Sequence, residues 1–283
     1  MEARKFWGLV IIAVLIVALI SAVYITTWGF GQRQEVQQTG AGQVTNNYKL
    51  TEAEMAGVNY VNFNFTSNTS GVDVSFQNGS GNLYDITVVR DNDTQEPTVT
   101  YTRDGDVLNV NVAMDSGSAT VLLGNSATYN GTFTSKIGGF SLSLGNNSKI
   151  DNLTSNIKYV GGGLVVINDT SFNTLNLNAN VGGFQIQAEK PTIRTTNASV
   201  FTNIQIGGIT VQATSQDNLG IKLNNVVDLG GISIPNEGFE ILQNSTTIAN
   251  IQTAGFAGKT NKLEINSNVG LGGININTFF FPA

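Results

Sequence analysis

The chain of 283 residues contains no cysteine, no histidine and only 4 prolines, and charged residues make up 12% of it. Without cysteine it can form neither a disulfide framework nor a thiolate metal site. Without histidine it lacks the commonest general base, the commonest metal ligand and the side chain that titrates near neutral pH. Serine–histidine, cysteine–histidine and zinc chemistry are therefore excluded, and only a carboxylate mechanism would remain for an enzyme.

Charge is also missing from one long N-terminal stretch. No charged residue occurs from Phe6 to Gln32, and residues 7–28 are mostly apolar. As a helix, a segment of this length would span about 33 Å, enough to cross the hydrocarbon core of a bilayer. Arg4 and Lys5 precede it, so the positive-inside rule places the N-terminus in the cytoplasm. We predict a cytoplasmic stub over residues 1–6, a transmembrane signal anchor over residues 7–28, and an extracellular remainder in the cell membrane.

A cleaved signal peptide is the competing interpretation of this stretch, with Ile20-Ser21-Ala22 as a poor small-residue cleavage site. The apolar run continues beyond that point to Trp28, which favours an uncleaved anchor. A lipoprotein is excluded by the lack of cysteine. The whole chain has a formal net charge of −6, and without Glu2, Arg4 and Lys5 the extracellular part keeps 12 basic and 19 acidic residues, a net of −7. Such an acidic part is a poor nucleic-acid surface, so no nucleic-acid partner is expected.

The part after the anchor changes composition twice. Residues 29–49 are rich in Gln, Gly, Thr and Asn without apolar periodicity, and we predict a flexible stalk there. Residues 50–135 carry runs that alternate between apolar and polar residues, separated by turn sequences such as Arg103-Asp104-Gly105-Asp106. Asp-Gly supplies the positive φ angles of a tight hairpin. This segment is predicted to be an irregular antiparallel β lead-in at the base of a larger fold.

A pair of glycines flanked by apolar residues recurs through the second half of the chain. The steps between first glycines are 23, 21, 25, 23 and 42 residues, and the last step is interpreted as two beats with a degenerate turn near Ala254-Gly255-Phe256. A period of this size indicates one supersecondary unit stacked on itself. The glycines are predicted to be structural corners, because no phosphate-loop motif accompanies them: Gly138, Gly139, Gly161, Gly162, Gly182, Gly183, Gly207, Gly208, Gly230, Gly231, Gly272 and Gly273.

Each beat contains one alternating run directly after the glycine pair and a second run further on, for example Ile209-Thr210-Val211-Gln212 and Ile221-Lys222-Leu223-Asn224. Apolar residues are expected to point inward and polar residues outward. Two strands and two turns in about 22 residues form one coil. We therefore predict an all-β chain whose residues 136–283 form a β-solenoid, or β-helix.

This combination of alternating strands, a glycine corner every twenty-odd residues and a less regular β lead-in resembles the bacterial and archaeal toast-rack adhesin-like β-strand-repeat family. The resemblance covers residues 58–277 and rests on a short motif. It implies a right-handed β-solenoid with an adhesin-like role, and here a membrane-anchored, archaeal protein. The family has no established catalytic residues to transfer to this chain.

Asparagine offers two further features. Ten Asn-x-Ser/Thr sequons make candidate glycosylation sites of an external domain: Asn64, Asn68, Asn78, Asn92, Asn130, Asn146, Asn152, Asn168, Asn197 and Asn244. Other asparagines recur at predicted strand ends, where amide ladders between coils are favoured over a sugar-binding face: Asn156, Asn178, Asn180, Asn203, Asn224, Asn225, Asn266 and Asn268. Phe279-Phe280-Phe281 at the C-terminal end is predicted to cover the last coil.

The function predicted from these features is a non-enzymatic, single-pass cell-surface protein with a structural or adhesin-like ectodomain. No catalytic residue, cofactor or metal site is expected, because the acidic residues of the repeats are spread singly. Expected partners are the membrane and surface glycans or cell-envelope proteins. The alternatives are a carbohydrate-active β-helix enzyme, which needs carboxylates paired on one face, and a pilin-like filament subunit whose apolar helix packs a fibre core.

Overall fold

The computed structural model describes residues 42–188, 191–214, 218–235 and 237–277, and these form thirteen β-strands. The strands are β1 (Gln43–Thr51), β2 (Tyr60–Gln77), β3 (Asn82–Asp91), β4 (Thr98–Asp104), β5 (Val107–Gly124), β6 (Thr128–Leu144), β7 (Ser148–Ile167), β8 (Thr170–Ala188), β9 (Asn197–Ala213), β10 (Leu219–Ser233), β11 (Glu240–Asn244), β12 (Ile248–Gln252) and β13 (Asn261–Asn277). A 3-10 turn lies at Phe256–Gly258. The prediction of an all-β fold is confirmed. Within the described residues no helix is long and apolar enough to span a membrane, and the predicted anchor over residues 7–28 lies outside them.

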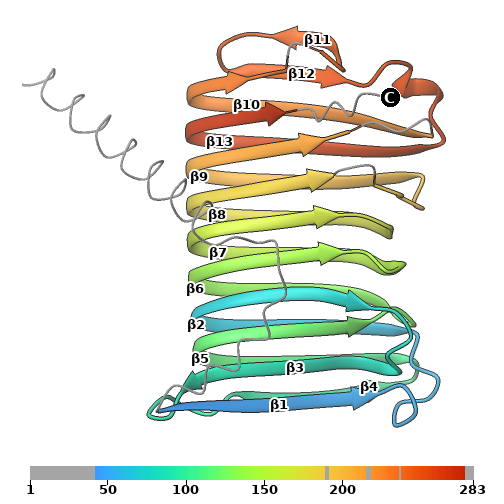
Figure 1. Cartoon of the computed structure of the whole chain (residues 1–283), viewed down its shortest axis with the longest axis vertical. Helices are drawn as coiled ribbons and strands as arrows, with labels where there is room; N and C mark the ends of the chain where they lie inside the picture. The colour runs from blue at the N-terminus through green and yellow to red at the C-terminus, as the bar shows by residue number, and fades with distance from the viewer. Residues whose placement is uncertain (1–41, 189–190, 215–217, 236, 278–283) are drawn as a thin grey trace, which may run out of the picture.

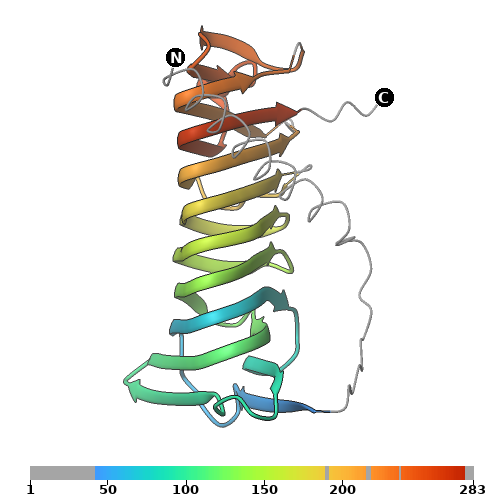
Figure 2. The same cartoon turned by 90° about the vertical axis from the view of Figure 1, so that its left-hand side faces the viewer.

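Eight long strands form the body of the molecule. In spatial order they are β5, β2, β6, β7, β8, β9, β13 and β10, and every neighbouring pair among them is parallel. Each long strand bends near its middle, so its two halves lie opposite one another. Stacked together, the halves form two facing walls (Figures 1 and 2). One coil is therefore a single strand bent in the middle, where the sequence suggested two strands separated by a turn.

The inward-facing positions change phase at the bend in most of the long strands, whereas β7 has odd positions inward on both sides of its bend. In β9 the buried side chains before the bend include Val200 and Ile204, at even positions, whereas those after it include Ile209 and Val211, at odd positions. The period-two alternation is therefore interrupted at the bend of β9, where Gln205 and Ile206 are two exposed residues in succession. The two residues at the bend of β9 are Gly207 and Gly208.

The first glycine of a pair is required by the stacking distance. Gly182, Gly207, Gly230 and Gly272 have φ between 134° and 148°, a range that L side chains rarely adopt. A Cβ at Gly207 would also overlap the carbonyl oxygen of Gly182 in the neighbouring coil. Strand β7 differs, because Val160 pairs with Gly138 in register and the register shifts around Gly161 and Gly162. A Cβ at either of those two glycines would meet nothing within 4 Å.

The order of the coils departs from the order of the sequence at both ends. Strand β2 lies between β5 and β6, and the last described strand, β13, lies between β9 and β10. The 42-residue step between Gly230 and Gly272 is not two beats with a degenerate turn, as predicted. It contains the antiparallel strands β11 and β12, which continue the sheet beyond β10, and the 3-10 turn from which the chain returns to β13.

Antiparallel strands cover both ends of the stack. Strands β3 and β4 pair with the two halves of β5, and β1 pairs with β3. Residues 50–135, predicted as an antiparallel lead-in, thus also supply the parallel strands β2 and β5. The stalk predicted over residues 29–49 overlaps β1, which begins at Gln43. The three C-terminal phenylalanines lie outside the described residues, and the strand that precedes them is not the last of the stack.

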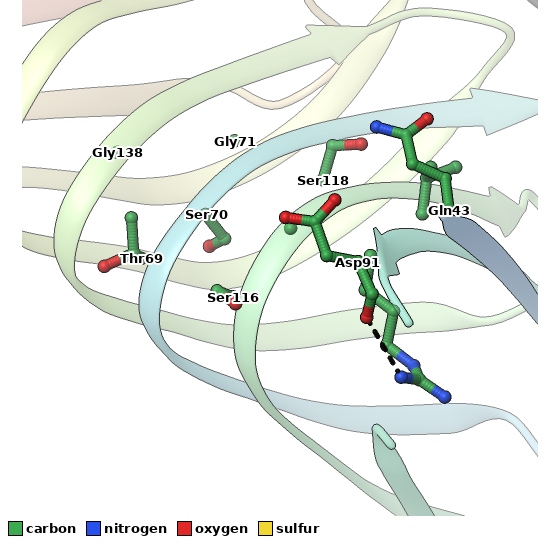
Figure 3. Close-up of a pocket in the computed structure, with 11 residues that line it drawn as sticks. Gln43, Thr69, Ser70, Gly71, Asp91, Ser116, Ser118 and Gly138 are labelled. Carbon is green, nitrogen blue, oxygen red and sulfur yellow. Dashed lines mark hydrogen bonds between the residues drawn. The ribbon is translucent and has the colours of Figure 1, made fainter. Parts of the chain in front are cut away.

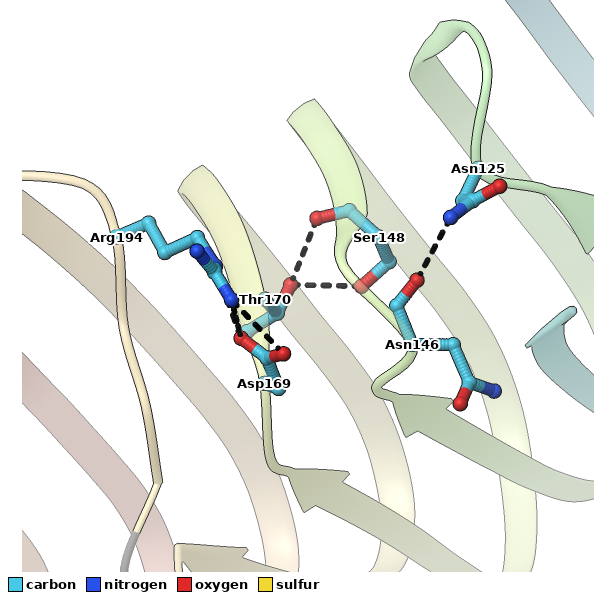
Figure 4. Close-up of polar contacts among 6 residues, drawn as sticks. All are labelled: Asn125, Asn146, Ser148, Asp169, Thr170 and Arg194. Carbon is cyan, nitrogen blue, oxygen red and sulfur yellow. Dashed lines mark hydrogen bonds and ion pairs between the residues drawn. The ribbon is translucent and has the colours of Figure 1, made fainter. Parts of the chain in front are cut away.

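Side chains tie the coils together in the core and at the turns. Phe133 of β6 packs with its ring centroid 5.7 Å from that of Phe63 in β2, both rings being buried. At the turn edge, the Ser148 hydroxyl donates to Thr170 Oγ1 (2.8 Å), and the Arg194 guanidinium makes two hydrogen bonds to the Asp169 carboxylate, of 2.9 and 3.0 Å (Figure 4). Each bond joins segments from different layers, so the turns stabilise the stacking as well as closing the coils.

Two buried tyrosines make the fold sensitive to alkaline pH. Burial raises the pKa of Tyr84 to about 12, and burial also raises the pKa of Tyr129, whose hydroxyl donates to the Leu83 carbonyl oxygen (2.6 Å). Since both folded-state pKa values lie above that of an unfolded tyrosine, this stabilisation is complete below about pH 10 and is lost as the pH rises through the folded values. We expect the free energy of unfolding, measured with urea, to fall between about pH 10 and pH 12.

The matched variant for this prediction is Tyr129→Phe. It removes one titrating group and the hydrogen bond to Leu83, so it should lower stability at pH 8 and reduce the slope of stability with pH above pH 10. A slope unchanged in the variant would contradict the assignment to Tyr129.

Candidate interaction surface

The bends of the long strands align into one exposed edge of the stack, which faces the reader in Figure 2. The residue before each bend is apolar in six successive coils; four of these side chains are exposed, and two, Val181 and Leu271, are partly buried. We call these side chains the corner ridge, in stack order Ile137, Tyr159, Val181, Ile206, Leu271 and Leu229. The exposed fraction is 51% for Ile137 and Leu229, 43% for Tyr159 and 38% for Ile206. Apolar residues of the alternating strands were expected to point inward, and the exposed members of the corner ridge are an exception to that expectation.

The corner ridge is bordered differently on its two sides. On one side lie the corner positions, which are glycine in most coils and carry no side chain. On the other side lies the residue that precedes each ridge residue, and these form a second outward row, the flanking row: Lys136, Lys158, Asn180, Gln205, Gly270 and Asp228. The Lys158 ammonium lies 5.3 Å from the centroid of the Tyr159 ring. The row is basic toward β6 and acidic at β10.

A polar hollow of about 380 Å³ lies on the same edge at the β6 end of the corner ridge (Figure 3). Thr69 and Ser116 occupy the ridge positions of β2 and β5, so the edge changes there from apolar to polar. The hollow is lined further by Gln43, Asp91 and Ser118. The adjacent Arg90 guanidinium is held in place by hydrogen bonds to Asn46 Oδ1 (3.0 Å) and to the Thr94 carbonyl oxygen (2.6 Å). Hydroxyl, amide and carboxylate groups of this kind can hold a small polar molecule.

Five of the eight asparagines predicted to form ladders do so, whereas Asn225 donates to the Ala249 carbonyl oxygen (3.1 Å). The Asn178 amide donates to Asn156 Oδ1 (2.9 Å), and the Asn203 amide donates to Asn178 Oδ1 (3.1 Å), which links β7, β8 and β9. Asn224 donates in the same way to Asn266 (2.9 Å) between β10 and β13. These amide groups are already engaged in hydrogen bonds between coils, which favours a structural role over a sugar-binding face.

The sequons divide into two groups according to whether the side-chain amide nitrogen donates a hydrogen bond to the protein. The amide nitrogens of Asn64, Asn68, Asn130 and Asn146 donate to protein acceptors, at 3.2, 2.6, 3.4 and 2.6 Å respectively. The exposed asparagines whose amide nitrogens make no hydrogen bond to described residues are Asn78, Asn92, Asn152, Asn168, Asn197 and Asn244.

Carboxylates do not gather on the described part of the molecule: no group of three or more Asp or Glu residues there is placed to hold a metal ion. Asp151 accepts from Asn173 (2.7 Å), Asp169 pairs with Arg194, and Glu240 accepts from Gln252 (3.1 Å). The acidic residues Glu189 and Asp217 lie outside the described residues.

Comparisons with known proteins find similarity in structure only. No model of a protein family and no curated protein matches the sequence. A crystal structure of a candidate cell adhesion protein from Clostridium sporogenes ATCC 15579 matches with a TM-score of 0.52 at 14% identity, covering 84% of this chain and 100% of that one. A candidate adhesin from Bacteroides fragilis NCTC 9343 (TM-score 0.32, 12% identity) and a candidate lipid-binding protein from Parabacteroides distasonis ATCC 8503 (TM-score 0.25, 13% identity) each match over 84% of this chain and 98% of theirs. The chain therefore shares its fold with the clostridial protein.

Proposed function

We propose that the chain is a non-enzymatic, single-pass cell-surface protein that displays an adhesin-like β-stack outside the cell. The observation that carries this proposal is the place of β1. It is the terminal strand at one end of the sheet, so the segment before it joins the stack at that end. An anchor over residues 7–28 would then hold the molecule by its β1 end, and β10, β12 and β11 would lie farthest from the membrane.

The dimensions of the stack suit a display role. Twelve strands follow one another in space from β1 to β11, and at a spacing of about 4.8 Å they make a body about 50 Å long. Among the described residues the distal strand β11 pairs on one side only, with β12, and it carries Ile241 and Leu242 exposed by 57% and 53%. Exposed apolar side chains at a far end and along one edge are features of contact surfaces. The fold shared with a candidate cell adhesion protein supports the same role.

The test is the location of the full chain in the cell that makes it. With an affinity tag at the C-terminus, we expect the protein to remain in the membrane fraction after washing at high pH. We also expect external protease to remove the tag from intact cells. Recovery of the protein from the culture medium, or a tag that is protected until the cells are lysed, would refute the proposal.

Glycosylation would follow from this location in a host that modifies sequons. We expect Asn78, Asn92, Asn152, Asn168, Asn197 and Asn244 to be occupied more fully than Asn64, Asn68, Asn130 and Asn146, because a glycan on the second group would be attached to an amide nitrogen that already donates a hydrogen bond to the protein. Site-by-site occupancy from peptide mass spectrometry of the native protein checks this order. Equal occupancy of both groups would contradict it.

A further inference from the structure

The corner ridge and its flanking row form a pattern that complements itself when reversed. The ridge begins at Ile137 in β6 and ends at Leu229 in β10, six coils in all. The residue that flanks Ile137 is Lys136, and the residue that flanks Leu229 is Asp228, both exposed. A second copy that faces this edge in the opposite direction would place its Asp228 against Lys136, and its Lys136 against Asp228.

We propose that the partner of this edge is a second copy of the same chain, bound antiparallel about a two-fold axis that crosses the ridge midway between Val181 and Ile206. In this arrangement all six ridge residues of each copy face the ridge of the other: Ile137 faces Leu229, Tyr159 faces Leu271, and Val181 faces Ile206. Two equivalent Lys136–Asp228 pairs close the ends. A two-fold interface of this kind uses the same patch on both copies.

The parallel arrangement lacks this match. With both copies pointing the same way, a two-fold axis along the stack would place the flanking row of each copy over the glycine corners of the other. Lys136 would then face a strip without side chains and Asp228 would have no cation opposite. Charge complementarity therefore selects the antiparallel orientation.

The antiparallel orientation of the two copies has a consequence for adhesion, which rests on the proposed function. If the β1 end is anchored, two antiparallel copies have their anchors at opposite ends, so the pair joins two facing membranes. The edge is about 24 Å long and about 15 Å wide, or about 360 Å², roughly half the area that each partner contributes to a stable complex. A single pair is therefore weak, and adhesion would come from many copies acting across one gap.

The test uses vesicles in two colours that carry the full chain, either inserted or attached through an N-terminal tag to nickel-chelating lipid. Mixed-colour clusters, counted by microscopy, should form with the unchanged chain. Lys136→Glu alone and Asp228→Lys alone should each reduce clustering about tenfold or more, because both end pairs become repulsive. Lys136→Glu vesicles mixed with Asp228→Lys vesicles should cluster with one another again, since each end pair then joins opposite charges.

The control is Lys149→Glu, an equal charge change at an exposed residue of β7 that lies outside the ridge and the flanking row. It should leave clustering unchanged, and circular dichroism should show the same β spectrum for every variant. Dispersed vesicles with the unchanged chain, or clusters that both single variants leave intact, would overturn the proposal. So would clusters that the mixed variants fail to restore. Failure of membrane insertion with clustering retained on tagged vesicles would instead refute only the anchor of the proposed function.

Discussion

Replacing Gly207 with alanine is expected to lower the free energy of unfolding by about 4 kcal/mol, because two independent costs add at this position. The backbone of Gly207 has a φ of 145°, which a residue with a Cβ rarely adopts. Its Cβ would also overlap the carbonyl oxygen of Gly182, a backbone atom of the neighbouring coil that cannot rotate away. The parallel ladder between β8 and β9 would have to open at the bend to admit the methyl group.

Gly161→Ala is the matched control, since it makes the same chemical change at another predicted corner. A Cβ there meets nothing within 4 Å, so the change should be neutral or should stabilise the protein by up to about 1 kcal/mol through the unfolded chain. Urea unfolding of the two variants beside the unchanged chain measures both effects. Equal losses in the two variants would mean that the close approach of the coils at Gly207 is not what requires glycine.

The glycine period predicted the layers of the fold but not the role of every glycine. Alternation of apolar and polar residues is a local property, so the all-β class could be inferred from the sequence, and the glycine pairs marked the bends of the later strands but not those of β2 and β5. The position of Val160 could not. Strand β7 has one extra residue at its bend, so that Val160 takes the register of a first glycine although it precedes the visible Gly161-Gly162 pair.

The spatial order of the coils could not be predicted from local sequence patterns either. Strands β10 and β13 carry the same apolar alternation and the same glycine pair, so either could pair with β9. The choice depends on how the chain between them folds: β11 and β12 cover β10 on its free side, which leaves the opposite side for β13. Pairing between segments so distant in sequence has no signature in a short window.

The candidate surface was predicted in part. The amide ladders followed from the recurrence of asparagine near the predicted strand ends. The corner ridge was not predicted, because apolar residues were expected in general to point inward. The sequence of β9 alternates without a break through Ile204, Gln205 and Ile206, and the two successive exposed positions, Gln205 and Ile206, are seen only in the structure. Two exposed residues in succession are what a bent strand produces on its convex side.

The position of β13 between β9 and β10 can be tested with introduced pairs of cysteines, because only residues of neighbouring strands lie close enough to form a disulfide. Thr210 of β9 pairs with Asn275 of β13, and Asn275 in turn pairs with Ser233 of β10. Neighbouring strands place paired residues about 4.8 Å apart, within the reach of a disulfide, whereas residues two strands apart are separated by about 10 Å, beyond it. The double variant Thr210→Cys/Asn275→Cys should therefore form an intramolecular disulfide under mild oxidation.

Thr210→Cys/Ser233→Cys is the comparison that separates this order from stacking in sequence order. With β13 between β9 and β10 the two cysteines should stay reduced, and both should react with an alkylating reagent. Because the natural chain has no cysteine, any disulfide detected by mass spectrometry of the intact protein comes from the introduced pair. If β10 lay directly on β9, as its place in the sequence suggests, the results of the two variants would be exchanged. The corner ridge would then have Ile206 beside Leu229, and the end charge carried by Asp228 would lie inside the edge instead of at its limit.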